Sequence, residues 1–137
     1  MRHHSFRVIN KYESGDVMEW VINNDTPIHE QLIKQLELRI ITGIYPIAER
    51  LPSVRDLALE ARVNPNTMQK ALIELERKGL IYTKRTIGKY VANNEAIIIQ
   101  AKEQMANELT SDFLLNMKKL GFDEKNILIY LTERMSK

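Results

Sequence analysis

Residues 51 to 79 constrain the fold of this chain most, because they contain two short segments with helical spacing of apolar residues, separated by a sharp break. Ser53 is placed to cap the first helix, since its hydroxyl can accept an N–H group of the first turn. Asn64 and Pro65 can open the second, as a cap and a first helical residue. Gly79 suits the left-handed position that commonly follows a helix. The pattern predicts a helix-turn-helix, whose second helix enters the major groove of DNA.

The flanking segments extend this motif into a larger unit. Apolar residues recur every three to four positions over residues 28 to 41, which predicts an amphipathic helix opened by Pro27. Two β-rich runs around a basic turn at residues 80 to 91 predict a hairpin. Alone, this hairpin would be a solvated edge whose cations prevent aggregation. Its place after the helix pair favours DNA contact, so residues 26 to 92 are expected to form a winged helix-turn-helix.

The positive charge of the chain lies in the same unit. The 137 residues have a net charge of only +2, yet residues 26 to 92 hold eleven basic and seven acidic side chains. The segments before and after it each carry a small negative excess. Because neutralised phosphates supply most non-specific affinity, this distribution supports DNA binding.

Other function classes find little support in the sequence. The chain has no cysteine, so it has no disulfide framework and no thiolate metal site. It also contains no P-loop motif, no nucleophile paired with a general base, and no side chains at the spacing typical of metal ligands. The apolar runs are too short to cross a bilayer, and the N-terminus lacks the apolar segment of a secretory signal. We therefore expect a cytoplasmic protein without enzymatic activity, cofactor, metal or membrane partner.

The two ends of the chain are expected to form extensions. Residues 1 to 25 predict an N-terminal tail with a short strand at residues 18 to 22, where apolar and polar residues alternate. Residues 93 to 137 predict two amphipathic helices, which are too small to form a core alone. They either cover the first domain or pair with a second chain, and a homodimer is favoured because DNA-reading modules usually bind two-fold sites as dimers. The residues expected to hold the dimer are Ile98, Ala101, Met105, Leu109, Phe113, Met117, Ile127, Leu128 and Leu131.

A set of fixed spacings carries a family resemblance. The runs at residues 27–31, 51–58, 63–67 and 79–81 resemble the DNA-binding domain of the GntR family of bacterial transcription regulators. The short tail is similar to that of the YtrA subfamily, in which it serves dimerisation. The resemblance implies a mainly α fold with a small β-hairpin and a helical dimerisation extension. It also implies a sequence-specific regulator, expected to be a repressor that binds an inverted-repeat operator as a homodimer.

The resemblance implies roles for individual residues. It identifies Arg55 as the base-reading arginine, and a guanidinium can bind guanine O6 and N7 with two parallel hydrogen bonds. The alternative is a surface ion pair with Asp56 or Glu60. The family positions near phosphates, the groove edge and the wing are matched by Ser53, Asn66, Thr67, Lys70, Arg85 and Gly88. The residues themselves add four further candidates for DNA contact: Asn64, which is mainly a cap, Gln69, Lys84 and Lys89.

The sequence departs from the family pattern at Ala48 and Thr86, where glycine is usual. Because threonine tolerates a positive φ poorly, we expect a reshaped wing tip. A second function class stays open, namely a winged-helix protein-interaction module without sequence-specific DNA binding. The basic middle segment argues against that class. No small-molecule effector is indicated by the residues, and two alternatives stay open: a ligand bound between the tail and the DNA-binding domain, or no effector.

Overall fold

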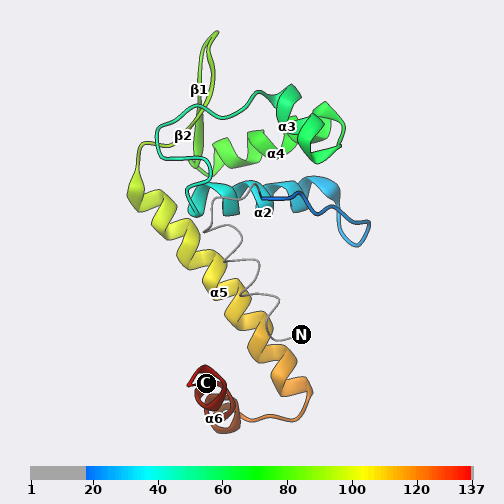
Figure 1. The fold of residues 1–137 in the computed structure, drawn as a ribbon, viewed down its shortest axis with the longest axis vertical. Helices are drawn as coiled ribbons and strands as arrows, with labels where there is room; N and C mark the ends of the chain where they lie inside the picture. Colours follow the sequence, from blue (N-terminus) through cyan, green and yellow to red (C-terminus); the bar gives the residue numbers. More distant parts are fainter. Residues whose placement is uncertain (1–17, 137) are drawn as a thin grey trace. The chain divides into compact units, whose positions relative to one another are not determined.

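The computed structural model describes residues 18–136, so residues 1–17 of the predicted tail lie outside the described residues. The chain divides into two compact units, one up to Ile98 and one from Ile99 onward. The mainly α architecture with one small hairpin confirms the predicted fold class (Figure 1). The first unit holds α2 (Ile28–Ile41), α3 (Val54–Ala61), α4 (Pro65–Arg77), β1 (Ile81–Lys84) and β2 (Gly88–Val91), while α5 (Glu95–Lys119) and α6 (Glu124–Met135) make up the tail.

The core of the first unit lies where α2, α3 and α4 pack together. Helical spacing places buried leucines of each helix on one face, and a buried leucine side chain contributes roughly 1.5–3 kcal/mol relative to an exposed one. The hairpin continues this core, because Ile81 and Val91 lie opposite each other in the antiparallel register and are both buried. The fully buried leucines are Leu32, Leu36, Leu57, Leu72 and Leu75.

The predicted helix starts follow from local capping chemistry. The Ser53 hydroxyl accepts a hydrogen bond from the Asp56 N–H at 3.1 Å. The Asn64 side-chain oxygen accepts one from the Asn66 N–H at 2.7 Å. Both predicted N-caps are therefore confirmed. The start of α2 differs slightly, because Pro27 is the N-cap itself and the helix begins one residue later.

The short strand predicted at residues 18–22 is wrong, because this extended segment attaches to side chains of α2 instead of pairing with a strand. The Val21 N–H donates to the Gln35 Oε1 at 2.9 Å, and the Gln35 Nε2 donates back to the Val21 carbonyl. Gln31 makes the same two contacts with the backbone of Asn23. A glutamine amide carries both donors and an acceptor, so it can replace the backbone of a partner strand.

A buried arginine completes the attachment of this segment. Arg39 is only 2% exposed, and its Nη2 donates to the Met18 carbonyl at 2.9 Å. Its guanidinium also lies 3.6 Å from the centre of the Trp20 ring. Nearby, burial raises the pKa of Tyr45 to about 12, an effect that Arg39 opposes. A buried charge needs such partners, so Arg39 fixes the chain that precedes α2.

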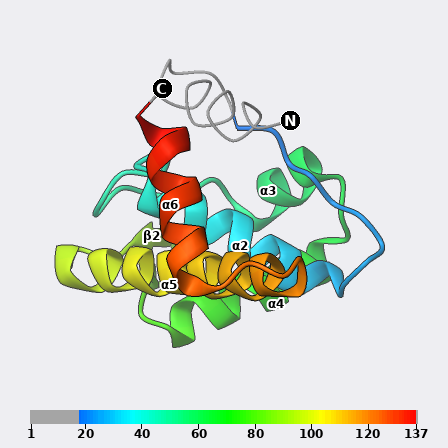
Figure 2. The same cartoon turned by 90° about the horizontal axis from the view of Figure 1, so that it is seen from below.

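The second unit is small and has little interior. Met117 at the end of α5 and Ile127 in α6 are buried. The Asp123 carboxylate caps α6 by accepting the Asn126 N–H at 2.8 Å. Figure 2 shows α6 lying crosswise to α5. None of the helices in the described residues is long and apolar enough to span a membrane.

Candidate nucleic-acid interface

The residues predicted to read DNA lie in the first two turns of α3 and α4 or cap these helices. Arg55 is the second residue of α3, and Asn66 is the second residue of α4. The start of a helix presents its free N–H groups and positive dipole end, which suits contact with phosphates. The structure leaves Ser53, Arg55, Asn64, Asn66 and Lys70 exposed, whereas Thr67 and Gln69 are partly buried.

Several cations near these helix starts and at the hairpin tip have no counter-charge among residues 18–136. Arg55, Lys70 and Arg85 are exposed, and no carboxylate within the described residues pairs with them. The alternative role of Arg55, an ion pair with Asp56 or Glu60, is therefore not observed in this part of the chain. Unpaired cations can neutralise phosphates without first breaking a contact.

The opposite end of α4 is neutralised. Arg77 pairs with Glu74, and the contact lowers the pKa of the Glu74 carboxyl from its ordinary value. Lys78 pairs with Glu37 of α2 at 3.1 Å. Among the described residues of this unit, unpaired positive charge thus lies near the helix starts and at the hairpin tip.

Lys89 is held differently from the other hairpin cations. Its ammonium lies 3.4 Å from the Glu76 carboxylate and 3.0 Å from the Thr83 hydroxyl, and its side chain is only 16% exposed. Lys84 is exposed, with its ammonium 4.4 Å from the centre of the Tyr90 ring. The predicted phosphate contact therefore suits Lys84 better than Lys89, whose charge is already engaged.

The structure brings the hairpin against the start of α3. The Leu51 N–H donates to the Lys89 carbonyl at 2.8 Å, and the Val91 N–H donates to the Glu49 carbonyl at 2.9 Å. A groove of about 380 Å³ lies between residues 50–54 and the hairpin. The predicted DNA-binding residues that line it are Ser53, Lys84, Gly88 and Lys89.

Sequence analysis did not identify Arg50, which also lines this groove. Its Nη2 donates to the carbonyl of Ile87 in the hairpin turn, 37 residues further along the chain. Periodicity and capping rules describe neighbours in sequence, so neither could have found a contact between two loops. The one available signal was an arginine placed directly before Leu51, where the helix-turn-helix begins.

The hairpin turn keeps a backbone conformation that favours glycine. Thr86 has a φ of +64°, and Ala48 in the loop before α3 has a φ of +63°. The expectation that threonine would reshape the turn to avoid a positive φ is therefore wrong. A hydrogen bond from the Ile87 N–H to the Lys84 carbonyl, 3.1 Å long, closes the turn around the strained residue.

Thr86→Gly is expected to raise the free energy of unfolding by about 1 kcal/mol, because the left-handed strain of a β-branched residue exceeds the entropy cost of glycine. Urea unfolding of the two proteins measures the difference. Arg85→Gly is the matched control, since Arg85 does not have a positive φ, and it should lower stability by roughly 0.5–1 kcal/mol. If both glycine variants lost stability equally, Thr86 would not be strained.

The predicted dimerisation residues differ in exposure. Leu109 and Leu128 are 65% and 66% exposed, and Phe113 is 36% exposed. Met117 and Ile127 are buried within a single chain, so they have less surface to offer a partner than the other predicted residues. Ile98, Ala101, Met105 and Leu131 are partly buried. Further large apolar residues of the tail are also exposed, namely Ile99, Leu115, Leu120, Ile129, Tyr130 and Met135.

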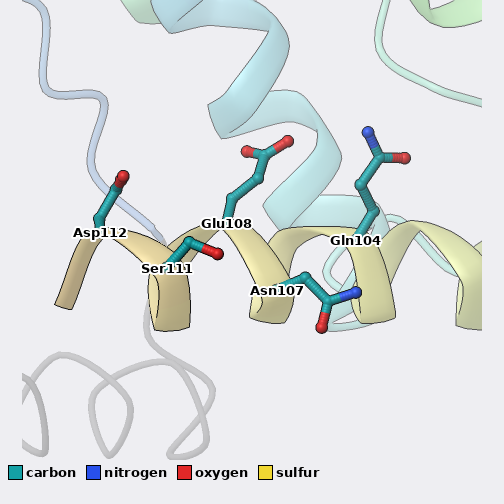
Figure 3. Close-up of a pocket in the computed structure, with 5 residues that line it drawn as sticks. All are labelled: Gln104, Asn107, Glu108, Ser111 and Asp112. Carbon is teal, nitrogen blue, oxygen red and sulfur yellow. The ribbon is translucent and has the colours of Figure 1, made fainter. Parts of the chain in front are cut away.

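Another side of α5 is polar. Figure 3 shows the side chains that line a depression along this helix, and all of them are hydrophilic. A depression lined only by polar residue types lacks the usual character of a small-molecule site, which is lined mostly by hydrophobic side chains. We therefore regard it as a solvated helix face. The residues concerned are Gln104, Asn107, Glu108, Ser111 and Asp112.

Comparison with known proteins places this arrangement among regulators. The family model for bacterial regulatory proteins of the gntR family matches residues 28–91. The HTH-type transcriptional repressor YtrA of Bacillus subtilis (strain 168) is 34% identical over 111 residues, covering 80% of this chain and 85% of the repressor. YhcF, an HTH-type transcriptional regulator of the same strain, is 32% identical over 111 residues, covering 81% and 92%. A solved GntR family transcriptional regulator from Listeria monocytogenes has a TM-score of 0.76 at 36% identity, covering 82% of this chain and 98% of its own.

Proposed function

We propose that this chain, which belongs to the GntR family of bacterial regulatory proteins, represses transcription. In this proposal it acts as a homodimer bound to an inverted-repeat operator. As a member of that family it is a DNA-binding transcription regulator with a winged helix-turn-helix. The repressor role is supported by its similarity to YtrA, which is named a transcriptional repressor. The same proposal locates the chain in the cytoplasm, where bacterial DNA lies, and involves no cofactor.

The observation that carries the proposal is the distribution of paired and unpaired cations. Arg55, Lys70 and Arg85 are exposed and unpaired within the described residues, whereas Arg77 and Lys78 are neutralised by carboxylates. Unpaired positive charge beside two exposed helix starts favours binding of a polyanion such as DNA. The polar residues among these cations have the donors and acceptors that base edges require.

The homodimer is supported by the apolar surface of the tail. Leu109 and Leu128 are about two-thirds exposed in a single chain. A contiguous exposed apolar patch marks an interaction surface, and we propose that these side chains form one along the tail. A stable interface buries about 800 Å² on each partner. A second copy of the same tail is the partner that a two-fold DNA site would require.

The experiment that tests the proposal is selection of bound duplexes from a random DNA library by the full-length protein. We expect a consensus of two inverted half-sites, with centres one helical turn or a multiple of it apart. A single half-site or a direct repeat would contradict the two-fold dimer. Placing the consensus over a promoter should then lower expression of a reporter gene when the protein is present, and increased expression would contradict the repressor role.

A further inference from the structure

We propose that Arg50 is a positioning residue that anchors the hairpin turn in the orientation required for DNA contact. The contact between Arg50 and the hairpin turn forms within the protein and does not require DNA. Its consequence for DNA rests on the proposed function. The experiment below therefore measures the two separately.

The anchor begins with the backbone around Arg50. This residue forms an isolated antiparallel bridge with Tyr90 of β2, and the adjacent Leu51 N–H donates to the Lys89 carbonyl. From this fixed position its side chain extends to the hairpin turn, where its Nη2 donates to the Ile87 carbonyl at 2.5 Å. The loop before α3 is thereby joined to the tip of the hairpin as well as to its base.

The hairpin tip needs such an anchor. The sheet consists of two strands of four residues each, and an isolated two-stranded hairpin is marginally stable in water. Its turn is exposed and contains Thr86 in a strained conformation. Within the described residues, Arg50 supplies the hydrogen bond to the turn that comes from outside the hairpin. A charged donor forms a hydrogen bond roughly twice as strong as a neutral one.

Gly88 provides the space that the anchor requires. A Cβ added to Gly88 would lie 3.0 Å from the Arg50 Nε and 3.2 Å from its Nη2. Any larger residue would therefore push against the guanidinium that holds the turn. The φ of +148° at Gly88 adds a second reason for glycine at this position. The structure thus assigns Gly88 a role inside the protein, in addition to the predicted approach to DNA.

The test compares full-length Arg50→Met with Arg77→Met, which removes the same charge from an exposed arginine whose guanidinium pairs with Glu74 of its own helix. Hydrogen exchange of the Ile87 amide is measured first, without DNA, because that N–H closes the turn. In Arg50→Met we expect faster exchange at Ile87, with unchanged exchange in the buried core of α4. In Arg77→Met the exchange at Ile87 should match the parent protein. Unchanged exchange at Ile87 in Arg50→Met would overturn the anchor.

Operator binding is measured on the same proteins. Arg50→Met should weaken it by about tenfold, the effect of losing one charge-assisted hydrogen bond, while Arg77→Met should not. A weaker affinity with unchanged Ile87 exchange would mean that Arg50 contacts DNA directly, which contradicts a positioning role. Faster exchange with unchanged affinity would show that the anchor does not serve binding. Absence of duplex binding by the parent protein would refute the proposed function, and the exchange comparison would still decide the anchor.

Gly88→Ala disturbs the same contact from the other side, since its methyl group would lie 3.0 Å from the Arg50 Nε and press on the guanidinium. The double variant Arg50→Met with Gly88→Ala should bind DNA no more weakly than the weaker single variant. This non-additivity is expected when two residues act through one contact. Additive losses would show that Arg50 and Gly88 act independently, and would overturn the shared role.

Discussion

Leu109→Glu is expected to convert the proposed dimer into a monomer at micromolar concentration. Leu109 is 65% exposed and lies within the apolar stripe that α5 carries from Ile98 onward. A carboxylate buried in an apolar interface without a partner costs several kcal/mol. A loss of about 3 kcal/mol raises the dissociation constant by more than a hundredfold. Sedimentation equilibrium of the full-length protein measures the change.

Leu115→Glu is the matched control for this prediction. Leu115 is 55% exposed on the same helix but lies six residues further on, which at 3.6 residues per turn places it on a different side of α5. The two variants therefore share the charge change and the loss of exposed apolar surface. Only Leu109→Glu should dissociate the dimer. Dissociation of both, or of neither, would contradict the assignment of the interface to the predicted stripe.

Loss of the dimer should also weaken binding to the operator. In a dimer, the second half-site is bound at the high effective concentration set by the connection between the two reading units. A monomer has no such advantage, so we expect the operator affinity of Leu109→Glu to fall by at least about a hundredfold. Binding to a single half-site should remain as in the parent protein, which separates loss of the dimer from damage to the DNA-binding unit.

The helix boundaries could be predicted because they depend on neighbours in sequence. Ser53 and Asn64 each cap a helix through an N–H group two or three residues away. The leucine spacing likewise predicted which side of each helix is buried, since a helix fixes that relation locally. The helix pair followed from these local rules, whereas the DNA-contact roles of Arg55, Asn66 and Thr67 rested on the family resemblance.

The contacts that sequence analysis missed join distant segments through polar side chains. The alternation around Trp20 predicted extended chain correctly, but the partner of that chain proved to be the amide groups of Gln31 and Gln35. Lys89 was predicted as a phosphate contact, yet Glu76 lies beside it once α4 and the hairpin pack. Periodicity separates buried from exposed positions, and it says nothing about which exposed groups will meet.

The prediction at Thr86 failed for a different reason. The preference of threonine against positive φ is real, but it amounts to only about 1–2 kcal/mol at one residue. The strands on either side and the Arg50 contact fix the turn together, so the local preference is overruled. Local rules are dependable where nothing competes with them, as at the helix caps, and weaker where packing determines the backbone.

Arg55→Ala is expected to reduce specific binding to the operator by about 1–3 kcal/mol, the range for losing one bidentate base contact. Arg55 is exposed as the second residue of α3 and has no ion-pair partner within the described residues. Its removal therefore leaves no buried charge behind and should not disturb the fold. Fluorescence anisotropy titrations with the selected operator and with a scrambled duplex measure the specific and the non-specific affinity.

Arg55→Lys separates reading a base from attracting a phosphate. Lysine keeps the positive charge but lacks the planar fork that binds guanine O6 and N7 together. We therefore expect Arg55→Lys to retain the affinity for the scrambled duplex and its salt dependence, while losing most of the preference for the operator. If Arg55→Ala weakened both duplexes equally and Arg55→Lys restored both, Arg55 would be a phosphate contact. If Arg55→Ala left the operator affinity unchanged, Arg55 would not belong to the DNA interface. The bases would then be recognised by residues at the start of α4, where Asn66 and Gln69 carry amide groups that can pair with adenine.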